Sequence, residues 1–215
     1  MCRAYATWEY CAGGAVAAAL CTWRGGARTA LDQTRACAKP TTISAGFYHT
    51  CALEDAGTVT CWGLSNWQQT IVPSGLGTVV SIAVGSDHTC ALNDTGAVPC
   101  WGRHQFTSVP IAVPMTLPNT VTAIAAGSEH TCAVNNDTST MAVGKVTCWG
   151  ANTAGQSTVP PGLGTVVAIS VGNSFSCALN NVGVVTCWGL NLYGETNVPI
   201  DLETVASISA GALHA

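Results

Sequence analysis

Four pairs of cysteines, three of them preceded by a histidine, are the residues of this chain whose types and spacing could do chemistry. The pairs recur along the sequence as Cys51/Cys61, Cys90/Cys100, Cys132/Cys148 and Cys177/Cys187. The histidines, each two residues before the first cysteine of its pair, are His49, His88 and His130. Two thiolates and an imidazole on one side of a strand could bind zinc, whereas two facing thiols alone form a disulfide.

The fourth pair distinguishes these two interpretations. Phe175 stands where the other units have histidine, yet Cys177 and Cys187 remain. A zinc site should lose its cysteines together with its histidine, but a disulfide has no use for the imidazole. We therefore predict that all eight cysteines are oxidised to disulfides and that the chain binds no metal or cofactor.

The segments that carry the pairs are predicted to be β-hairpins. In each unit a β-rich run such as HTCAL is followed by a turn containing glycine and a second β-rich run such as TVTCWG. Three pairs are ten residues apart and symmetric about the turn, so folding the hairpin sets the two cysteines opposite each other. The third unit has six extra residues, and because six is even, both cysteines stay on one face of the longer hairpin.

These hairpins belong to a unit that repeats through most of the chain. The glycines that open successive units, in segments such as ISAGFYHTCAL, are Gly46, Gly85, Gly127, Gly172 and Gly211. A period of about 40 residues with three or four short strands is typical of propeller blades, which bury their apolar faces only against their neighbours. We therefore predict an all-β fold of β-propeller-type repeats, four full blades and a partial one, either open or completed by neighbouring chains.

The repeats also define the expected domain organisation. Residues 1–42 form a cysteine-rich N-terminal segment, which is either a cap or an irregular first blade. Propeller repeats occupy residues 43–215, as the units 43–81, 82–123, 124–168 and 169–207 and the partial unit 208–215. The four remaining cysteines could form two further disulfides in any of three connectivities; they are Cys2, Cys11, Cys21 and Cys37.

The repeat consensus resembles that of the regulator of chromosome condensation repeat family. The matching residues are the AGxxHTCAL segment, the segment ending in Trp-Gly, and WGxNxxGQxxVP at residues 149–160 and 188–199. The wording is most similar to a short-repeat, secreted, cysteine-paired subgroup that includes a propeller-type β-lactamase inhibitor. The resemblance covers residues 43–215. Because propellers of this family usually close with seven blades, it also implies that four units and a fragment leave the propeller open.

Disulfides at this density indicate an oxidising compartment. Each bridge closes a loop of about 10 residues, which stabilises the folded chain by about 2.5–3 kcal/mol in the chain-entropy model. Such bridges persist outside the cell and are rare in the cytosol. The expected location is therefore extracellular or on the cell surface.

The charge balance excludes one class of partner. Residues 43–215 carry only Arg103 and Lys145 as cations, against nine carboxylates. A nucleic-acid-binding surface needs a basic stripe that neutralises phosphates, so nucleic acid is not an expected partner. No apolar run reaches the 18 or so residues that a membrane-spanning helix requires.

Several other residues stand out from the consensus or recur in it. The recurring histidines are interpreted as packing or hydrogen-bonding residues, because a catalytic histidine needs a nucleophile or carboxylate in one asymmetric site. The recurring Trp-Gly is interpreted as a wedge between blades. Exposed aromatic residues of the loops form a candidate binding surface: Trp67, Phe106 and Tyr193. Two glycosylation sequons begin at Asn93 and Asn136.

No motif for nucleophilic, phosphoryl-transfer or metal-dependent catalysis is present, so the chain is not expected to be an enzyme. We expect an extracellular, disulfide-stabilised structural or protein-interaction module, with self-association into an oligomer, filament or surface layer and with a glycan as a further partner. One alternative is an inhibitor or binder of a secreted enzyme. A second is the guanine-nucleotide exchange that the family name suggests, which the disulfides and the acidic repeats disfavour.

Overall fold

The computed structural model describes residues 40–103, 112–118, 120–137 and 142–215. The chain divides into two compact units, residues 1–38 and 39–215. The first unit, with four of the predicted disulfide cysteines, lies outside the described residues; these cysteines are Cys2, Cys11, Cys21 and Cys37. The account below therefore concerns the second unit.

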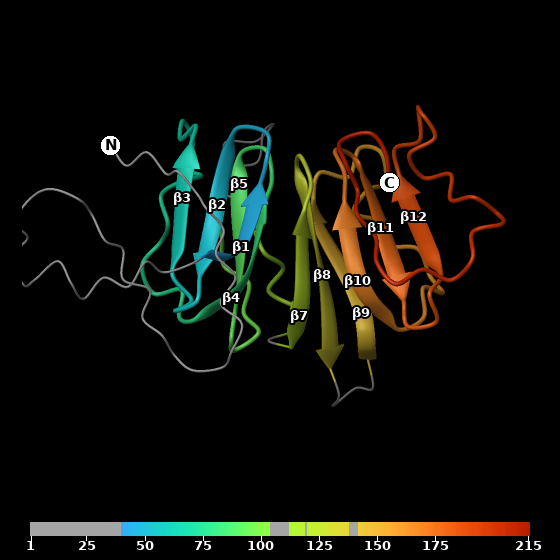
Figure 1. The fold of residues 1–215 in the computed structure, drawn as a ribbon, viewed down its shortest axis with the longest axis horizontal. Coiled ribbons are helices and arrows are strands. Elements are labelled where there is room, and N and C mark those ends of the chain that lie inside the picture. The colour runs from blue at the N-terminus through green and yellow to red at the C-terminus, as the bar shows by residue number, and fades with distance from the viewer. Residues whose placement is uncertain (1–39, 104–111, 119, 138–141) are drawn as a thin grey trace, which may run out of the picture. The chain divides into compact units, whose positions relative to one another are not determined.

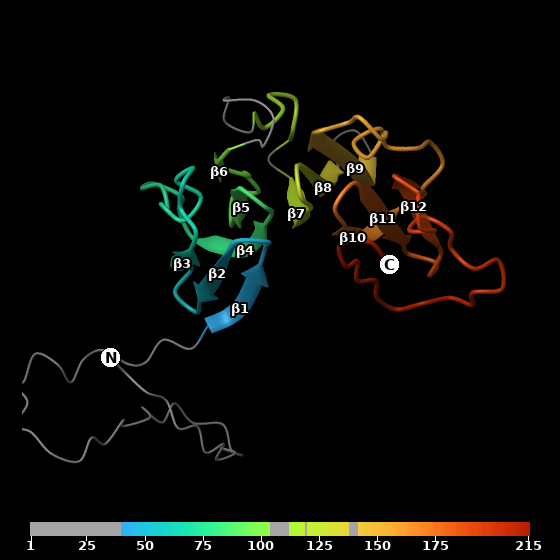
Figure 2. The same cartoon turned by 90° about the horizontal axis from the view of Figure 1, so that it is seen from above.

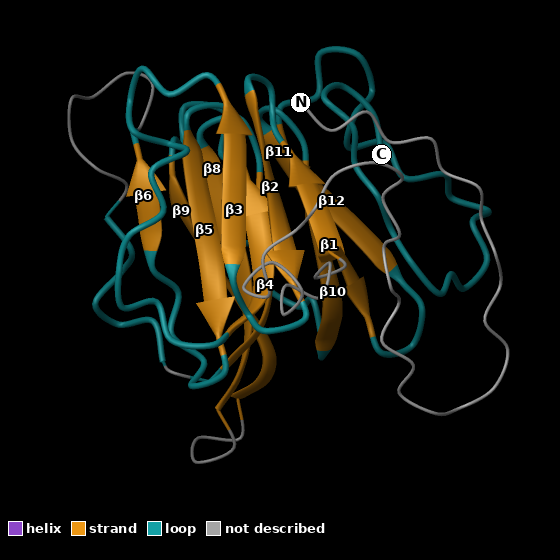
Figure 3. Cartoon of the chain, turned by 60° about the vertical axis from the view of Figure 1, so that its left-hand side comes forward, coloured by secondary structure: helices purple, strands orange, loops and turns teal. Residues whose placement is uncertain are grey.

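The second unit is all-β, as predicted. Its strands form four antiparallel sheets of three strands each, in the orders β1-β2-β3, β4-β5-β6, β7-β8-β9 and β10-β11-β12 (Figures 1 and 3). The strands are β1 (Pro40–Ala45), β2 (His49–Glu54), β3 (Val59–Gly63), β4 (Val79–Val84), β5 (His88–Asn93), β6 (Cys100–Gly102), β7 (Val121–Ala126), β8 (His130–Asp137), β9 (Ala142–Gly150), β10 (Val166–Val171), β11 (Phe175–Asn180) and β12 (Val185–Gly189). We call these sheets blades 1 to 4.

Each blade is built in the same way because each unit has the same sequence pattern. The middle strand is buried along most of its length, as in β5, where only Asn93 reaches the surface layer. A tight turn joins it to the third strand, and a glycine occupies the position of positive φ, for example Gly57 (φ 76°) and Gly183 (φ 83°). In the pairing of the first and middle strands, the register shifts once at the start of the first strand of every blade.

The hydrophobic core lies between blades rather than within them. Each of its three clusters combines the face of one blade with a tryptophan from the third strand of the next blade. Trp101 packs on blade 1, Trp149 on blade 2 and Trp188 on blade 3. Figure 2 shows the four blades following one another in an arc, with the first strand of each blade on its inner side.

Residues after blade 4 extend this arrangement without forming a strand. Ala210 N donates to Ser170 Oγ over 2.8 Å, as Val84 N donates to Ser44 Oγ over 3.2 Å between blades 1 and 2. Asn173 N also donates to the carbonyl oxygen of Ala212. Residues 208–214 thus occupy the position that the next blade's first strand would take. In the described part of the chain, no helix is long and apolar enough to span a bilayer.

Candidate functional site

The predicted disulfides are present in all four blades. Within each hairpin the two cysteines are register partners, including Cys132 and Cys148 across the lengthened third hairpin. The Cα atoms of each pair lie 4.0–4.1 Å apart. The first cysteine of every pair is completely buried, so the disulfides are part of the core between blades.

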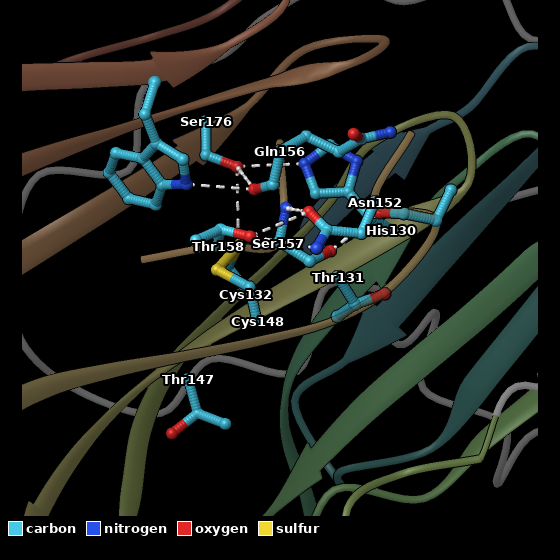
Figure 4. Close-up of a disulfide and its surroundings, with 12 residues drawn as sticks. His130, Thr131, Cys132, Thr147, Cys148, Asn152, Gln156, Ser157, Thr158 and Ser176 are labelled. Atoms are coloured by element: carbon cyan, nitrogen blue, oxygen red, sulfur yellow. Dashed lines mark hydrogen bonds between the residues drawn. A yellow bond between two sulfur atoms is a disulfide. The ribbon is translucent and has the colours of Figure 1, made fainter. Parts of the chain in front are cut away.

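The recurring histidines hydrogen-bond to the next blade. His49 Nε2 lies 2.8 Å from Thr89 Oγ1, His88 Nε2 lies 2.9 Å from Thr131 Oγ1, and His130 Nε2 lies 2.9 Å from Ser176 Oγ. Each hydroxyl oxygen also lies 3.5–3.8 Å from the buried sulfur of the same preceding blade (Figure 4). The predicted hydrogen-bonding role of the histidines is therefore correct, and its partner is a hydroxyl of the following blade.

A backbone carbonyl collects two donors at the same joint. Thr89 Oγ1 donates to the carbonyl oxygen of Gln69 over 3.0 Å, and Trp101 Nε1 donates to the same oxygen over 2.9 Å. The joint between blades 3 and 4 repeats this geometry: Gln156 O accepts from Ser176 Oγ over 3.1 Å and from Trp188 Nε1 over 2.9 Å. We call this arrangement the carbonyl joint.

Proton bookkeeping at the carbonyl joint assigns the histidine tautomer. The single hydroxyl proton of Ser176 goes to Gln156 O, so the imidazole of His130 must donate from Nε2–H. His130 Nδ1 is then unprotonated, and among the described residues it has no hydrogen-bond donor. Burial lowers the pKa of His130 to about 4 and also lowers the pKa of His49. Both imidazoles are therefore neutral at pH 7, and the joint is suited to structure rather than to proton transfer.

Blade 4 departs from this network in two matched positions. Phe175, which replaces the histidine, is fully buried. The residue that corresponds to the hydroxyl of the next unit is Ala215. An apolar ring thus faces an apolar position where the other joints pair an imidazole with a hydroxyl. Reading both positions together explains the substitution, which the disulfide argument alone leaves unexplained.

The joint between blades 2 and 3 lacks its carbonyl partner among the described residues. Trp149 Nε1 is buried and has no hydrogen-bond acceptor there. In the sequence, the loop after Trp101 reads RHQFTSVP and has lost the Gly-Gln of WGxNxxGQ. Residues 104–111 of this loop, including the predicted binding residue Phe106, lie outside the described residues.

The other two candidate binding residues lie on exposed loops of different blades. Trp67 of blade 1 is 44% exposed, and its ring stacks under the guanidinium of Arg103, whose carbon lies 3.6 Å from the ring centroid. Tyr193 of blade 4 is 76% exposed. Blades 2 and 3 separate them, so the structure does not gather Trp67 and Tyr193 into one cluster.

The loops that carry these aromatic residues are fixed by a buried side chain. Trp67 N donates to Gln69 Oε1 over 2.8 Å, and Tyr193 N donates to Glu195 Oε2 over 2.7 Å. In blade 3, Ala154 N donates to Gln156 Oε1 in the same way. The buried Gln or Glu was missed in the sequence, although its signal was the Gln or Glu that recurs seven residues after the tryptophan.

Both sequon asparagines lie at the hairpin turns. Asn93 Oδ1 accepts from Thr95 N, Thr95 Oγ1 and Ala97 N, and its amide donates to the carbonyl oxygen of Leu76 over 3.1 Å. Asn180 makes the corresponding turn in blade 4 without a sequon. Asn136 Oδ1 accepts from Gly144 N over 2.7 Å. Turn geometry therefore accounts for Asn93, and glycosylation at either site stays a prediction.

Sequence comparison identifies the repeats. The model of the regulator of chromosome condensation (RCC1) repeat matches residues 41–66, 79–106 and 166–195, which belong to blades 1, 2 and 4. No curated protein matches the chain by sequence.

Solved structures with a similar fold are RCC1-like propellers. The CRINKLY ectodomain of the Arabidopsis thaliana receptor kinase ACR4 is 25% identical with a TM-score of 0.59, over 71% of this chain and 51% of the ectodomain chain. The ectodomain of the Physcomitrella patens receptor kinase CR4 is 28% identical with a TM-score of 0.59, over 81% and 45%. Prp20p from Saccharomyces cerevisiae, at 20% identity and a TM-score of 0.58, matches over 74% and 47% and shows the fold alone. The chain thus spans about half the length of these proteins.

Proposed function

Because this chain is built from repeats of the regulator of chromosome condensation (RCC1) family, we propose that it is a disulfide-stabilised protein-interaction module that works outside the cell or on its surface. The observation that carries the proposal is the burial of one cystine in every blade, at the centre of each joint. A reducing compartment would leave eight buried thiols in place of these four crosslinks.

The loops of the blades supply the proposed binding surface. Trp67 and Tyr193 are exposed aromatic residues on loops that Gln69 and Glu195 hold in place. Aromatic side chains on rigid loops are favoured at protein-protein contacts because they bury a large area and lose little conformational entropy. The two plant proteins of similar fold are ectodomains of receptor kinases, which supports a place for this chain outside the cell.

A single preparation tests the location and the crosslinks. The chain is produced by secretion from a eukaryotic cell and by expression in a reducing cytosol, and intact mass is measured with and without reductant. We expect the secreted chain to gain about 2 Da per disulfide on reduction and to lose its cooperative unfolding transition. A chain that folds equally well with all its thiols free would overturn the proposed compartment.

The binding surface is tested on the secreted chain. Immobilised chain is exposed to extracellular fluid from its own source, and captured proteins are compared with those held by the double variant Trp67→Ala/Tyr193→Ala. We expect the variant to lose a specific protein while its free energy of unfolding stays unchanged. If both chains capture the same proteins in the same amounts, these loops are not the binding surface.

Inhibition of a secreted enzyme is the second candidate function. The cation–π contact between Arg103 and Trp67 gives one loop a rigid, exposed aromatic edge of the kind that can enter an enzyme cleft. Assays against secreted β-lactamases and proteases distinguish the two functions: tight inhibition that Trp67→Ala removes supports this candidate, and no inhibition across the panel refutes it.

A further inference from the structure

A cavity in blade 4 corresponds to the position that a tryptophan fills in each of the other joints. The cavity has a volume of about 230 Å³ and lies against the Cys177–Cys187 disulfide. Its apolar lining includes Val185, Val198 and Leu202. We call it the blade-4 cavity.

Blade 1 shows what these lining residues do when an indole is present. The counterparts of the lining in blade 1 are Cys51, Cys61, Val59, Val72 and Leu76, and all of them belong to the cluster that receives Trp101. Blade 3 receives Trp188 on the same set of positions. The blade-4 cavity therefore has the apolar lining of an indole site, three residue types of which recur unchanged.

The polar wall of the cavity is that of the carbonyl joint. Glu195 stands where blades 1 and 3 have the glutamine whose carbonyl oxygen accepts an indole N–H. Its side chain is 4% exposed and lines the cavity, and Oε1 has no hydrogen-bond partner among the described residues. A buried acceptor without a donor costs free energy, so this wall favours a ligand that donates hydrogen bonds.

The chain also presents the matching indole. Trp62 on β3 is 51% exposed, whereas the other three tryptophans of the Trp-Gly positions are buried. Ile43 on β1 and Leu64 next to β3 are exposed on the same blade. Thr50 is the blade-1 counterpart of Thr89 and Ser176, the hydroxyls that donate at the carbonyl joint. Blade 1 thus carries the indole and the hydroxyl that a joint requires.

We propose that the blade-4 cavity binds Trp62 of a second copy of this chain, so that blade 4 of one copy and blade 1 of the next form a joint of the kind already present three times within the chain. The indole of the second copy rests on the Cys177–Cys187 disulfide and donates to the carbonyl oxygen of Glu195, which also accepts from the hydroxyl of Thr50. The inference rests on the proposed interaction function and specifies its partner.

The segment that now lies beside the cavity can be replaced by the incoming blade. Residues 208–214 read ISAGALH, and residues 43–49 of β1 and its following loop read ISAGFYH. The incoming β1 can therefore re-form the hydrogen bond from Ala210 N to Ser170 Oγ, using its own Ala45 N. Because residues 208–214 are not in a strand, the exchange replaces loop contacts with those of a formed sheet.

Such a contact joins two different surfaces, and this decides what it can assemble. A head-to-tail joint leaves a free blade 1 and a free blade 4 at the ends of every dimer, so copies add until a ring closes or a filament grows. Self-association by this route is concentration-dependent and requires both surfaces.

The test uses one variant of each surface and a matched exposed tryptophan. Sedimentation velocity is measured on the secreted, fully oxidised chain, on Trp62→Ala, on Leu202→Asp and on the control Trp67→Ala, with intact mass and unfolding midpoints recorded for each. We expect concentration-dependent particles for the wild-type chain and for Trp67→Ala. Trp62→Ala and Leu202→Asp alone should raise the dissociation constant at least about tenfold.

Mixing the two variants gives the decisive result. Trp62→Ala keeps an intact cavity and Leu202→Asp keeps an intact Trp62, so an equimolar mixture should form dimers and no larger particles. A wild-type chain that stays monomeric at every concentration, or a Trp62→Ala chain that associates like wild type, overturns the inference. The proposed function then stands or falls separately, on disulfide formation and on the loop-dependent capture of another protein.

Discussion

The imidazole Nε2 of His130 in blade 3 lies 2.9 Å from the hydroxyl oxygen of Ser176 in blade 4. That hydroxyl in turn donates to Gln156 O and approaches the buried sulfur of Cys132. One small polar group therefore links an imidazole, a backbone carbonyl and a disulfide across the boundary between two blades. Because the histidine is buried and neutral, this linkage should depend on pH.

Acid should weaken the fold through His130. The folded-state pKa is lowered to about 4 from an unfolded value of 6.5, so the unfolded chain binds more protons between these values. Stability is therefore fully present above pH 6.5 and falls as the pH drops toward 4. Between pH 7 and pH 5 the loss from this one group is about 2 kcal/mol.

Urea unfolding at pH 7 and pH 5 measures this loss. His49, whose pKa is also lowered, acts in the same direction, and Glu129, whose pKa burial raises, acts in the opposite one. The double variant His130→Phe/Ser176→Ala copies the apolar pair of Phe175 and Ala215. It should reduce the pH dependence by about 2 kcal/mol. An unchanged pH dependence in this variant would show that His130 does not titrate on unfolding.

Removing one disulfide should cost about the chain entropy that it restrains. In the double variant Cys90→Ser/Cys100→Ser, the loop between residues 90 and 100 is no longer closed, so we expect the free energy of unfolding to fall by about 3 kcal/mol. The measurement is urea unfolding of the oxidised chain. Cys132→Ser/Cys148→Ser closes a longer loop and should lose slightly more. A loss below about 1 kcal/mol in both variants would contradict the entropic account.

Much of the fold follows from residues that recur. The cysteine spacing predicts the hairpin register correctly, including the even insertion that keeps Cys132 opposite Cys148. The replacement of histidine by Phe175 correctly favours disulfides over zinc. These inferences succeed because a register or a crosslink is a local relation between two side chains.

The joints between blades could not be derived in the same way. Gln69 acts at the joint through its backbone carbonyl, which leaves no signature of residue type. The exposure of Trp62 depends on its place in the array, although its sequence context equals that of the buried Trp101. Trp67 and Tyr193 were grouped as one surface, but the spacing between units, rather than the residues, determines that they lie on separate blades.

Two equivalent tryptophans should respond differently to the loss of their N–H group. Trp188 donates to Gln156 O, whereas Trp149 has no acceptor among the described residues. Trp188→Phe should therefore destabilise the chain by about 1 kcal/mol more than Trp149→Phe, since both remove the same apolar area. Thermal and urea unfolding of the two variants check this. Equal losses would mean that the carbonyl joint contributes no net hydrogen-bond energy.

The glycines that open the blades should resist substitution for a steric reason. A Cβ on Gly127 would overlap the carbonyl oxygen of Gly172 in the next blade and lie 2.7 Å from Val171 Cγ1. Gly162 has φ 81° but open space around its Cβ position, so it isolates the cost of backbone conformation. We expect Gly162→Ala to cost about 1 kcal/mol.

Gly127→Ala should cost at least about 2 kcal/mol more than Gly162→Ala, because two blades must move apart to admit a methyl group. The loss should appear in urea unfolding together with a weaker joint between blades 3 and 4, seen as faster amide exchange along β7 and β10. If Gly127→Ala and Gly162→Ala prove equally stable, the close approach of the blades at Gly127 is not a constraint on the fold. The glycines at the start of each unit would then serve the chain only through their conformational freedom.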